Sequence, residues 1–356
     1  NGWNDTSSFA NENNNGYGIN INGGSITNCK ISNSLIINAG HVAYFFVGGG
    51  NHAAVNCMGV AHDTGNGSDY IFDYFGSSNN LNLNCTAIRA YSSTTAHQSR
   101  CNTFQARSDN NIMENFTCIN ARMQFENSNG NKVKDLNIST INGASGENSG
   151  SIQIYAQADN NIIENYSITG GGGISFLGEA TPESPRTHRS AGENNYFING
   201  KISNLKNENG NAVISFHRLG SNNGITAGNN YVIGLTADNF PWIINANRPG
   251  TIHIYNSSFS NGENSRIDTF YSGWSNSLGN YTANFTNSNF YNNNFPNPSG
   301  TNISNGNPLL DNNLNPQAGS ALIDKGMDAG TLISEAAYDF DGKPRSIPYD
   351  LGAYEY

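Results

Sequence analysis

One short segment recurs along this chain and constrains its fold more than any other feature. The clearest copies open with two asparagines and continue with alternating apolar and polar residues. They begin at Asn79, Asn110, Asn160, Asn194 and Asn229, and looser copies begin near Asn22, Asn51, Asn131, Thr251 and Asn280. The intervals run from 20 to 35 residues, and most are close to 30. Repetition at this period predicts a solenoid, in which each unit packs on its neighbours.

A second strand-like stretch follows each opening segment. Apolar and polar residues alternate with period two in residues 43–47, 103–107, 123–126, 152–156, 174–177, 214–217 and 243–247, as expected for half-buried strands. No helix-length amphipathic pattern separates these stretches, and 64 Asn with 40 Gly disfavour helices. The sequence therefore predicts an all-β fold, a parallel β-helix of about ten rungs.

Charge excludes several classes of partner. Only 12% of the residues are charged, the net charge is −10, and no basic tract or basic–aromatic face occurs, so we expect no nucleic acid partner. No run of 18 apolar residues exists, which argues against a transmembrane helix. The chain begins at Asn1 rather than Met, as expected for a processed or trimmed segment.

Two side-chain columns are predicted from the repeat. Cys29, Cys57 and Cys85 are 28 residues apart and are expected to stack, either as buried free thiols or with one disulfide. A second column of asparagines, each four or five positions after the start of its unit, is expected to be buried at one turn, where amides bond to each other and to the backbone. Its members are Asn84, Asn115, Asn165, Asn199 and Asn284.

The repeat pattern ends near Asn307, and the last 50 residues have a different character. They contain Gly-Ser-Ala-Leu-Ile-Asp-Lys-Gly from Gly319, Asp-Phe-Asp-Gly-Lys-Pro-Arg from Asp339, and Asp-Leu-Gly-Ala-Tyr-Glu-Tyr from Asp350. This tail resembles the closing segment of secreted bacterial right-handed parallel β-helix proteins, the broad group that includes pectate-lyase-like enzymes.

The resemblance implies a right-handed coil and a secreted, extracellular or cell-surface protein. We therefore expect a β-helix over residues 1–306 and a capping or flanking segment over residues 307–356, which would cover the open end of the solenoid. No cofactor is expected, although Asp339 and Asp341 lie on a turn that could form a calcium (Ca²⁺) loop.

Aligning the second strands of the units predicts outward columns of polar side chains. One column contains Gln105, Glu126, Tyr155, Leu177 and His217. A second contains Arg107, Ser128, Gln157 and Glu179, and a third contains Gln124, Gln153, Ser175 and Ser215. In a chain so poor in charge, this face is suited to hydrogen bonding and proton transfer, so we expect a polysaccharide to bind along it. Trp242 is expected to flank the face as a platform for a sugar ring.

Cationic side chains gather next to this face. A long Pro-containing loop carries Arg186, His188 and Arg189, and the following unit carries His217 and Arg218. Arginine binds carboxylate or sulfate through two parallel hydrogen bonds, which favours an anionic glycan. Elimination beside a uronate needs a cation, a base and an acid. We assign these roles to Arg218 or Arg186, to His217 and to Tyr155.

Hydrolysis and a purely structural role are the alternatives for these residues. Hydrolysis needs two carboxyl groups about 5–9.5 Å apart. Glu126 and Glu179 are the available pair, and counting three rungs between them gives ~14 Å, which favours elimination. The structural role would be salt bridges from the Arg and His side chains to Glu179 and Glu183 that hold the loop.

Two function classes follow from the sequence. The first is a secreted lyase, or less favourably a glycoside hydrolase, that acts on an anionic polysaccharide; the His- and Arg-containing loop favours it. The second is a non-catalytic extracellular β-solenoid, such as an adhesin, a surface-layer component or a filament subunit. The uniform rungs and high Asn content favour this second class, which also predicts self-association. An open groove shared by the Arg and His residues would distinguish the enzyme.

Overall fold

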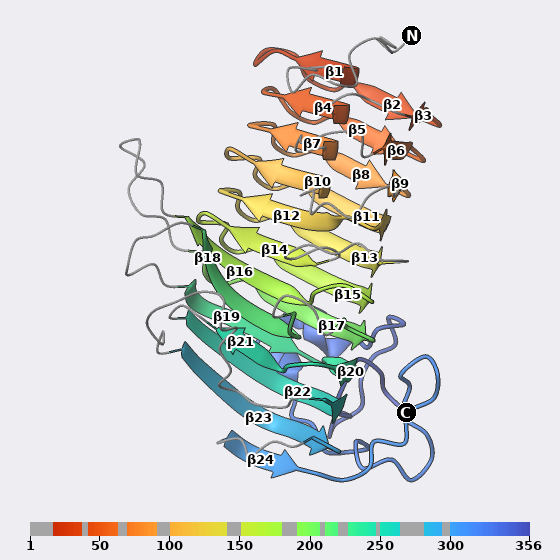
Figure 1. Ribbon diagram of the computed structural model, residues 1–356, viewed down its shortest axis with the longest axis vertical. Helices are drawn as coiled ribbons and strands as arrows, with labels where there is room; N and C mark the ends of the chain where they lie inside the picture. Colours follow the sequence, from red (N-terminus) through yellow and green to blue (C-terminus); the bar gives the residue numbers. More distant parts are fainter. Residues whose placement is uncertain are drawn as a thin grey trace.

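The structure is a computed structural model. It describes residues 17–37, 42–62, 70–90, 100–140, 151–179, 191–206, 211–219, 227–246, 250–263, 281–293 and 300–356, and only the backbone of residues 62, 90, 178–179 and 217–219. Strands stack from the N-terminal end to the C-terminal end of an elongated molecule (Figure 1).

The described strands form two long sheets. The nine-stranded sheet contains, in spatial order, β1 (Tyr17–Asn22), β4 (Val42–Val47), β7 (Tyr70–Phe75), β10 (Arg100–Gln105), β12 (Arg122–Glu126), β14 (Ile152–Tyr155), β16 (Ile174–Glu179), β18 (Ile214–Leu219) and β21 (Ile244–Ala246). The fifteen-stranded sheet contains β2 (Lys30–Ser32), β3 (Leu35–Ile37), β5 (Ala53–Val55), β6 (Met58–His62), β8 (Leu81–Leu83), β9 (Thr86–Ala90), β11 (Ile112–Ile119), β13 (Lys132–Ser139), β15 (Ile162–Thr169), β17 (Tyr196–Ser203), β19 (Ala227–Ile233), β20 (Thr236–Phe240), β22 (Gly250–Gly262), β23 (Tyr281–Tyr291) and β24 (Gly300–Ser304). Pairing is parallel throughout both sheets. The predicted right-handed parallel β-helix is confirmed.

The core consists of inward-facing side chains that repeat from rung to rung. Tyr44 stacks on Phe72 with ring centroids 4.5 Å apart, and Phe46 stacks on Tyr74 at 4.7 Å. These distances match the ~4.8 Å spacing of neighbouring strands, so identical positions on adjacent rungs meet face to face. All four rings are fully buried. The period-two pattern read from the sequence therefore corresponds to one continuous stacked core.

A buried ladder of asparagines runs along one turn of the solenoid. It contains Asn80, Asn111, Asn131, Asn161, Asn195 and Asn230, each at most 2% exposed. The side-chain amide of each residue donates to the side-chain oxygen of the next at 2.8–2.9 Å. The same oxygen also accepts the preceding rung's backbone N–H at 2.9–3.1 Å. This ladder was not predicted from the sequence, because the buried column was expected at the turn that contains Asn84 and Asn115.

The predicted column through Asn84, Asn115, Asn165 and Asn199 exists, but only part of it is buried. Asn115 donates to Asn84 at 2.9 Å, and Asn199 donates to Asn165 at 3.3 Å. All four have left-handed backbones, with φ between 51° and 54°. Asn84 and Asn115 are exposed, whereas Asn165 and Asn199 are buried. Asn199 also donates to the carbonyl of Tyr338 in the C-terminal segment, which covers the lower part of the column.

Asn284 does not belong to this column. It lies within β23 and pairs with His253 of β22, whereas Asn287, with φ of 48°, has the left-handed turn conformation. Asn280, which opens this unit, lies outside the described residues. The turn lies at Asn287, three residues after the position predicted at Asn284.

The cysteine stack is confirmed for two residues and wrong for the third. The backbone N–H of Cys57 points at the sulfur of Cys85 at 3.4 Å, and both thiols are free and buried. Cys29 instead lies beside His52, because Lys30 pairs with Ala53. His52 continues the buried ladder: its backbone N–H donates to Asn80, and its ring nitrogen accepts from the backbone of Cys29. The first rung is thus five residues shorter than the spacing of 28 implied.

One disulfide links the two sheets. It joins Cys101 of β10 to Cys118 of β11, with Cα atoms 5.8 Å apart. Their side chains face each other across the core, because Cys101 leaves the nine-stranded sheet inward and Cys118 leaves the fifteen-stranded sheet inward.

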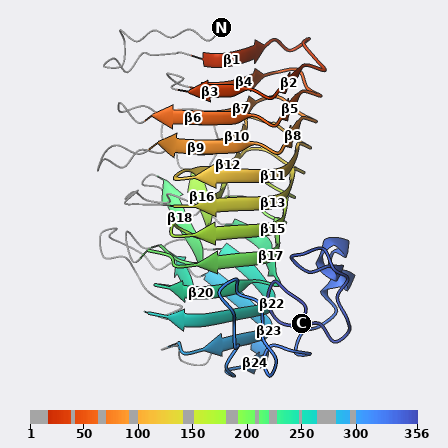
Figure 2. The same cartoon turned by 90° about the vertical axis from the view of Figure 1, so that its right-hand side faces the viewer.

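The C-terminal segment flanks the later rungs. It contains the short 3₁₀ helices η1 (Ala329–Thr331) and η2 (Ser334–Ala337) and lies beside the fifteen-stranded sheet (Figure 2). Ala329, Ala336 and Tyr349 form a small apolar cluster with Ile198 of β17 and Ile233 of β19. The C-terminal segment therefore covers the apolar side chains and turn amides on this side of the solenoid.

We expect the buried ladder to carry much of the stability. Replacing Asn161 with Ala removes the acceptor for two donors of Asn131 and one of the two donors to the side-chain oxygen of Asn195. Because each buried polar group left without a partner costs about 1–3 kcal/mol, the free energy of unfolding should fall by roughly 2–5 kcal/mol. Urea denaturation measures this change. Asn115→Ala is the matched control, since Asn115 is exposed; an equal loss in both variants would contradict the assignment.

Candidate functional site

The register of the predicted outward columns is confirmed by strand pairing. Gln105 pairs with Glu126, Glu126 with Tyr155, Tyr155 with Leu177, and Leu177 with His217. The neighbouring column contains Gln124, Gln153, Ser175 and Ser215 in the same order. Both columns lie on the nine-stranded sheet, opposite the inward-facing core residues.

The two columns differ in exposure, which the sequence did not indicate. Gln105, Glu126 and Tyr155 are partly exposed, whereas Gln124 and Gln153 are 1% exposed. The face therefore has an accessible row of side chains and a buried row beside it. A ligand would meet the first row, and the second row would set its orientation and charge.

The buried row includes charged residues that the sequence analysis did not single out. Arg100 of β10 pairs with Arg122 of β12, and both are buried. The guanidinium of Arg100 lies over the ring of Tyr70 at 4.6 Å. Asp73 of β7 is also buried, at 3% exposure. We call Tyr70, Asp73, Arg100, Gln105, Arg122, Gln124 and Glu126 the arginine cluster.

Hydrogen bonds connect the buried row to the accessible row. Arg100 Nε donates to Gln124 Oε1 at 2.5 Å, and Gln124 Nε2 donates to Glu126 Oε2 at 2.7 Å. Gln105 Nε2 donates to both carboxylate oxygens of Asp73, at 2.8 and 2.9 Å. The side-chain amides of Gln105 and Gln124 thus connect the buried charged groups to the accessible row. The hydrogen bond from Gln124 holds the carboxylate of Glu126 in one orientation.

Burial changes the acidity of two groups in the cluster. Burial raises the pKa of Asp73 to about 7, with a further rise from nearby Glu126, against the opposing effects of Gln105 and Arg100. Burial and the neighbouring charge of Arg100 lower the pKa of Arg122 to about 9. At neutral pH Asp73 is therefore about half protonated, while Arg122 keeps its charge. The positive charges of Arg100 and Arg122 therefore face less than two full negative charges from Asp73 and Glu126.

Several buried polar atoms beside the cluster lack a hydrogen-bond partner within the described part of the chain. They are Arg100 Nη1, Thr103 Oγ1, Gln153 Nε2 and Ser175 Oγ. Buried polar atoms are almost always satisfied, so a group of such atoms needs an explanation such as water or a ligand. Thr103, Gln153 and Ser175 belong to the buried column itself. Their donors and acceptors are suited to hydroxyl groups.

The other predicted site residues differ in exposure, and three of them lie outside the described residues. Arg107 and Gln157 are exposed at left-handed turns, with φ of 68° and 64°. Trp242 is partly exposed. The predicted catalytic Arg186 and His188, together with Arg189, lie outside the described residues.

For three further predicted residues only the backbone is described, and it corrects one distance. Arg218 pairs with Gly178, next to the His217 pairing. Glu179 lies on β16, which is separated from β12 and Glu126 only by β14. The separation is thus two strand spacings, where three had been counted, because β12, β14 and β16 are consecutive strands of this sheet.

The predicted calcium loop is a tight turn closed by its own amides. Asp339 Oδ1 accepts from the backbone of Asp341 at 3.0 Å and of Lys343 at 2.8 Å. Asp339 Oδ2 accepts from Glu355 at 3.3 Å. Among the described residues no group of three or more His, Cys, Asp and Glu side chains is arranged to hold a metal ion.

Comparison with known proteins leaves the function to be argued from the site. No protein-family model matches this chain. A search of curated proteins finds no significant match. Within the described ranges, none of the helices is long and apolar enough to cross a membrane.

The raised pKa of Asp73 predicts a pH-dependent stability. The pKa rises from 3.8 to about 7 on folding, so the folded state binds this proton more tightly. Its contribution is full below about pH 4 and is lost as the pH rises through 7. Wild-type stability should therefore fall by about 2–3 kcal/mol from pH 5 to pH 8 because of this group, and Asp73→Asn should lack that fall. Urea denaturation at both pH values, with the exposed Asp341→Asn as control, tests this; parallel slopes for wild type and Asp73→Asn would refute it.

Proposed function

We propose that this protein binds an anionic polysaccharide along the outer face of the nine-stranded sheet and cleaves it by elimination. The observation that carries the proposal is the pair of buried arginines, Arg100 and Arg122, with Arg100 connected through Gln124 to the partly exposed Glu126. A glycan-cleaving role also agrees with the exposed Arg107 at the edge of the same face.

The electrostatics of the arginine cluster favour an anionic ligand. The pKa of Arg122 is lowered first by burial and then by the like charge of Arg100 on the adjacent rung, which repels it. A uronate or sulfate group close to them would relieve this repulsion, and the interaction would be strong because the guanidinium groups are shielded from water. The unpartnered Arg100 Nη1, among the described residues, is a donor available for such an anion.

The accessible row supplies contacts for the sugar rings. Phe75 of β7 is 45% exposed and pairs with Gln105, so an apolar ring lies directly beside the polar side chains. Gln105, Glu126 and Tyr155 follow on successive strands at ~4.8 Å intervals. A polysaccharide lying along the solenoid axis would meet aromatic, amide, carboxylate and phenol groups in turn.

The proposed elimination uses the catalytic roles that the sequence predicts for individual residues. Tyr155 would protonate the leaving oxygen, and His217, two strand spacings away in the same column, would remove the proton beside the carboxylate. Arg218 or Arg186 would neutralise the substrate's acid group, supported by the field of Arg100 and Arg122. Gln153, Gln157, Glu179, Arg189 and Trp242 would contact other sugar units.

Hydrolysis is a second reaction that one observation favours. Asp73 has a raised pKa, as a general acid requires, while Glu126 lies close enough to raise it further. A carboxyl pair of this kind is absent from the elimination scheme. The products distinguish the reactions, since only elimination forms a new carbon–carbon double bond.

We further propose that the protein is secreted and acts outside the cell. Its low charge and its many uncharged polar residues suit an extracellular polysaccharide environment, and its tail resembles that of secreted β-helix proteins. A non-catalytic role as an adhesin, surface-layer component or filament subunit would use the same face for binding alone.

The test is incubation with a panel of uronate-containing, sulfated and neutral glycans. Elimination from a uronate polymer should appear as ultraviolet absorbance of the new double bond. His217→Ala and Tyr155→Phe should each reduce the rate by about 10²–10⁴-fold, because they remove the base and the acid of the two proton transfers. New reducing ends without absorbance would instead indicate hydrolysis, which Asp73→Asn should then abolish.

The control is Lys134→Gln on the fifteen-stranded sheet. Lys134 forms an exposed ion pair with Glu164 at 3.2 Å, far from the proposed face, so this variant should retain full activity. Binding of an anionic glycan without cleavage would leave the non-catalytic alternative. Absence of binding to every anionic glycan would contradict the proposal.

A further inference from the structure

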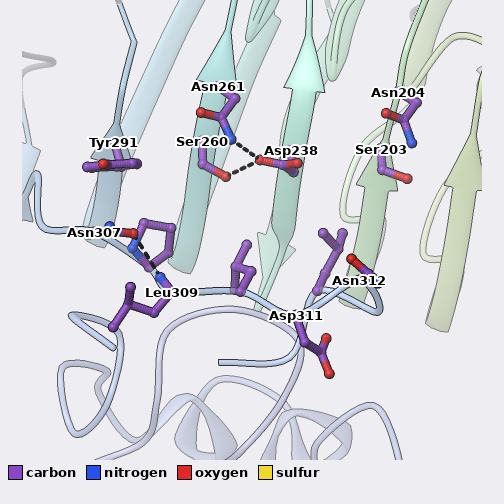
Figure 3. Close-up of a pocket in the computed structure, with 13 residues that line it drawn as sticks. Ser203, Asn204, Asp238, Ser260, Asn261, Tyr291, Asn307, Leu309, Asp311 and Asn312 are labelled. Atoms are coloured by element: carbon purple, nitrogen blue, oxygen red, sulfur yellow. Dashed lines mark hydrogen bonds between the residues drawn. The ribbon is translucent and has the colours of Figure 1, made fainter. Parts of the chain in front are cut away.

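A separate pocket lies between the ends of four strands and the start of the C-terminal segment. It has a volume of about 520 Å³, which is within the usual range for small-molecule sites. Ser203, Asp238, Ser260 and Tyr291 line it from the strands, and Leu309 and Asp311 line it from the segment (Figure 3). It belongs to the fifteen-stranded sheet and shares no residue with the arginine cluster.

The strand side of the pocket is one continuous column of side chains. Ser203 of β17 pairs with Asp238 of β20, Asp238 with Ser260 of β22, and Ser260 with Tyr291 of β23. Because parallel strands in register direct equivalent side chains the same way, these four groups follow one another at ~4.8 Å. The pocket thus presents a hydroxyl, a carboxylate, a second hydroxyl and an aromatic ring in a row.

Asp238 is the fixed acceptor at the centre of this row. Its Oδ1 accepts from Ser260 Oγ at 2.6 Å and from Asn261 Nδ2 at 2.8 Å (Figure 3). Its other oxygen, Oδ2, accepts no hydrogen bond from the residues that the structure describes. One oxygen therefore holds the carboxylate in place while the other remains available to a ligand donor.

The opposite wall combines apolar surface with a second carboxylate. Leu309 is 40% exposed, and Pro308, Leu310 and Leu314 line the same wall. Asp311 accepts hydrogen bonds from the backbone of Asn313 and Asn315 at 2.8 and 2.9 Å. Although burial alone would raise the pKa of Asp311, these bonds lower it, so Asp311 carries a full negative charge at neutral pH.

Lys201 of β17 does not line the pocket, although its charge is one of the causes that lower the pKa of Asp311. Lys201 Nζ donates to the hydroxyl of Tyr354 at 2.8 Å and lies over the ring of Phe340 at 4.0 Å. Its ammonium group is therefore held against the C-terminal segment. Two carboxylates and several amides dominate the lining, which repels anions.

We propose that this pocket binds an uncharged sugar. Vicinal hydroxyl groups would donate to Asp238 Oδ2 and to the neighbouring amide oxygens, while the apolar face of the ring would pack on Tyr291 or on Leu309. A uronate is excluded by Asp238 and Asp311. The ligand is thus uncharged, whereas the one proposed for the nine-stranded sheet is anionic, and the two sites can be tested separately.

The experiment is calorimetric titration of the full chain with neutral gluco-, galacto- and manno-configured disaccharides, each compared with a uronate disaccharide. At least one neutral disaccharide should bind, and the uronate should not bind at this site. Asp238→Asn should weaken the neutral ligand by about 10-fold or more, because a hydrogen bond to a charged acceptor is lost. Tyr291→Leu, which keeps an apolar side chain but removes the flat ring, should also weaken it and gives a second test if Asp238→Asn folds poorly.

Glu114→Gln is the matched control, because it makes the same change of charge at an exposed position of β11 on the same sheet. It should bind the neutral sugar as tightly as wild type, and so should Glu126→Gln of the proposed polysaccharide site. The proposal is overturned if no neutral disaccharide binds, if Asp238→Asn and Tyr291→Leu both bind normally, or if calcium alone occupies the pocket in a titration that Asp238→Asn abolishes.

Discussion

The fold depends on one repeated hydrogen bond, from the amide of a buried asparagine to the amide oxygen of the asparagine one rung below. Each such oxygen also accepts a backbone N–H, so a single side chain satisfies a turn that has no regular secondary structure. Asparagine suits this position because its side chain carries a donor and an acceptor and remains uncharged when buried. A chain with one Asn in six residues thus obtains its solubility and its internal order from the same residue type.

The ladder also explains why side chains outside the core are aligned. Because neighbouring turns must meet amide to amide, successive strands are locked in register, and equivalent positions form straight columns. Arg100 and Arg122 are adjacent for this reason, as are Asp238 and Ser260. The two sheets carry columns of opposite chemistry: buried cations on the nine-stranded sheet, and carboxylates beside hydroxyls at the strand ends of the fifteen-stranded sheet.

The sequence was sufficient for the fold class and for the order of the outward columns, since both follow from spacing. It was insufficient wherever turn length varied. Cys29 was misplaced because the first rung is short, and Asn284 because its turn lies three residues later. Arg100, Arg122 and Asp73 were overlooked although charged residues at strand positions are rare in this chain. The rarity itself was a usable signal, whereas burial and pKa depend on packing that spacing does not reveal.

The C-terminal segment makes contacts that tie it to particular rungs. It bonds to Asn199, Asn256 and Asn287, which lie on different strands of the turn column. Inserting or deleting a rung between them would displace one contact from the others by ~4.8 Å. The C-terminal segment therefore fits only one number of rungs in the later half of the solenoid. The rungs between β1 and β12 make no such contact within the described residues, so their number can vary during evolution or design.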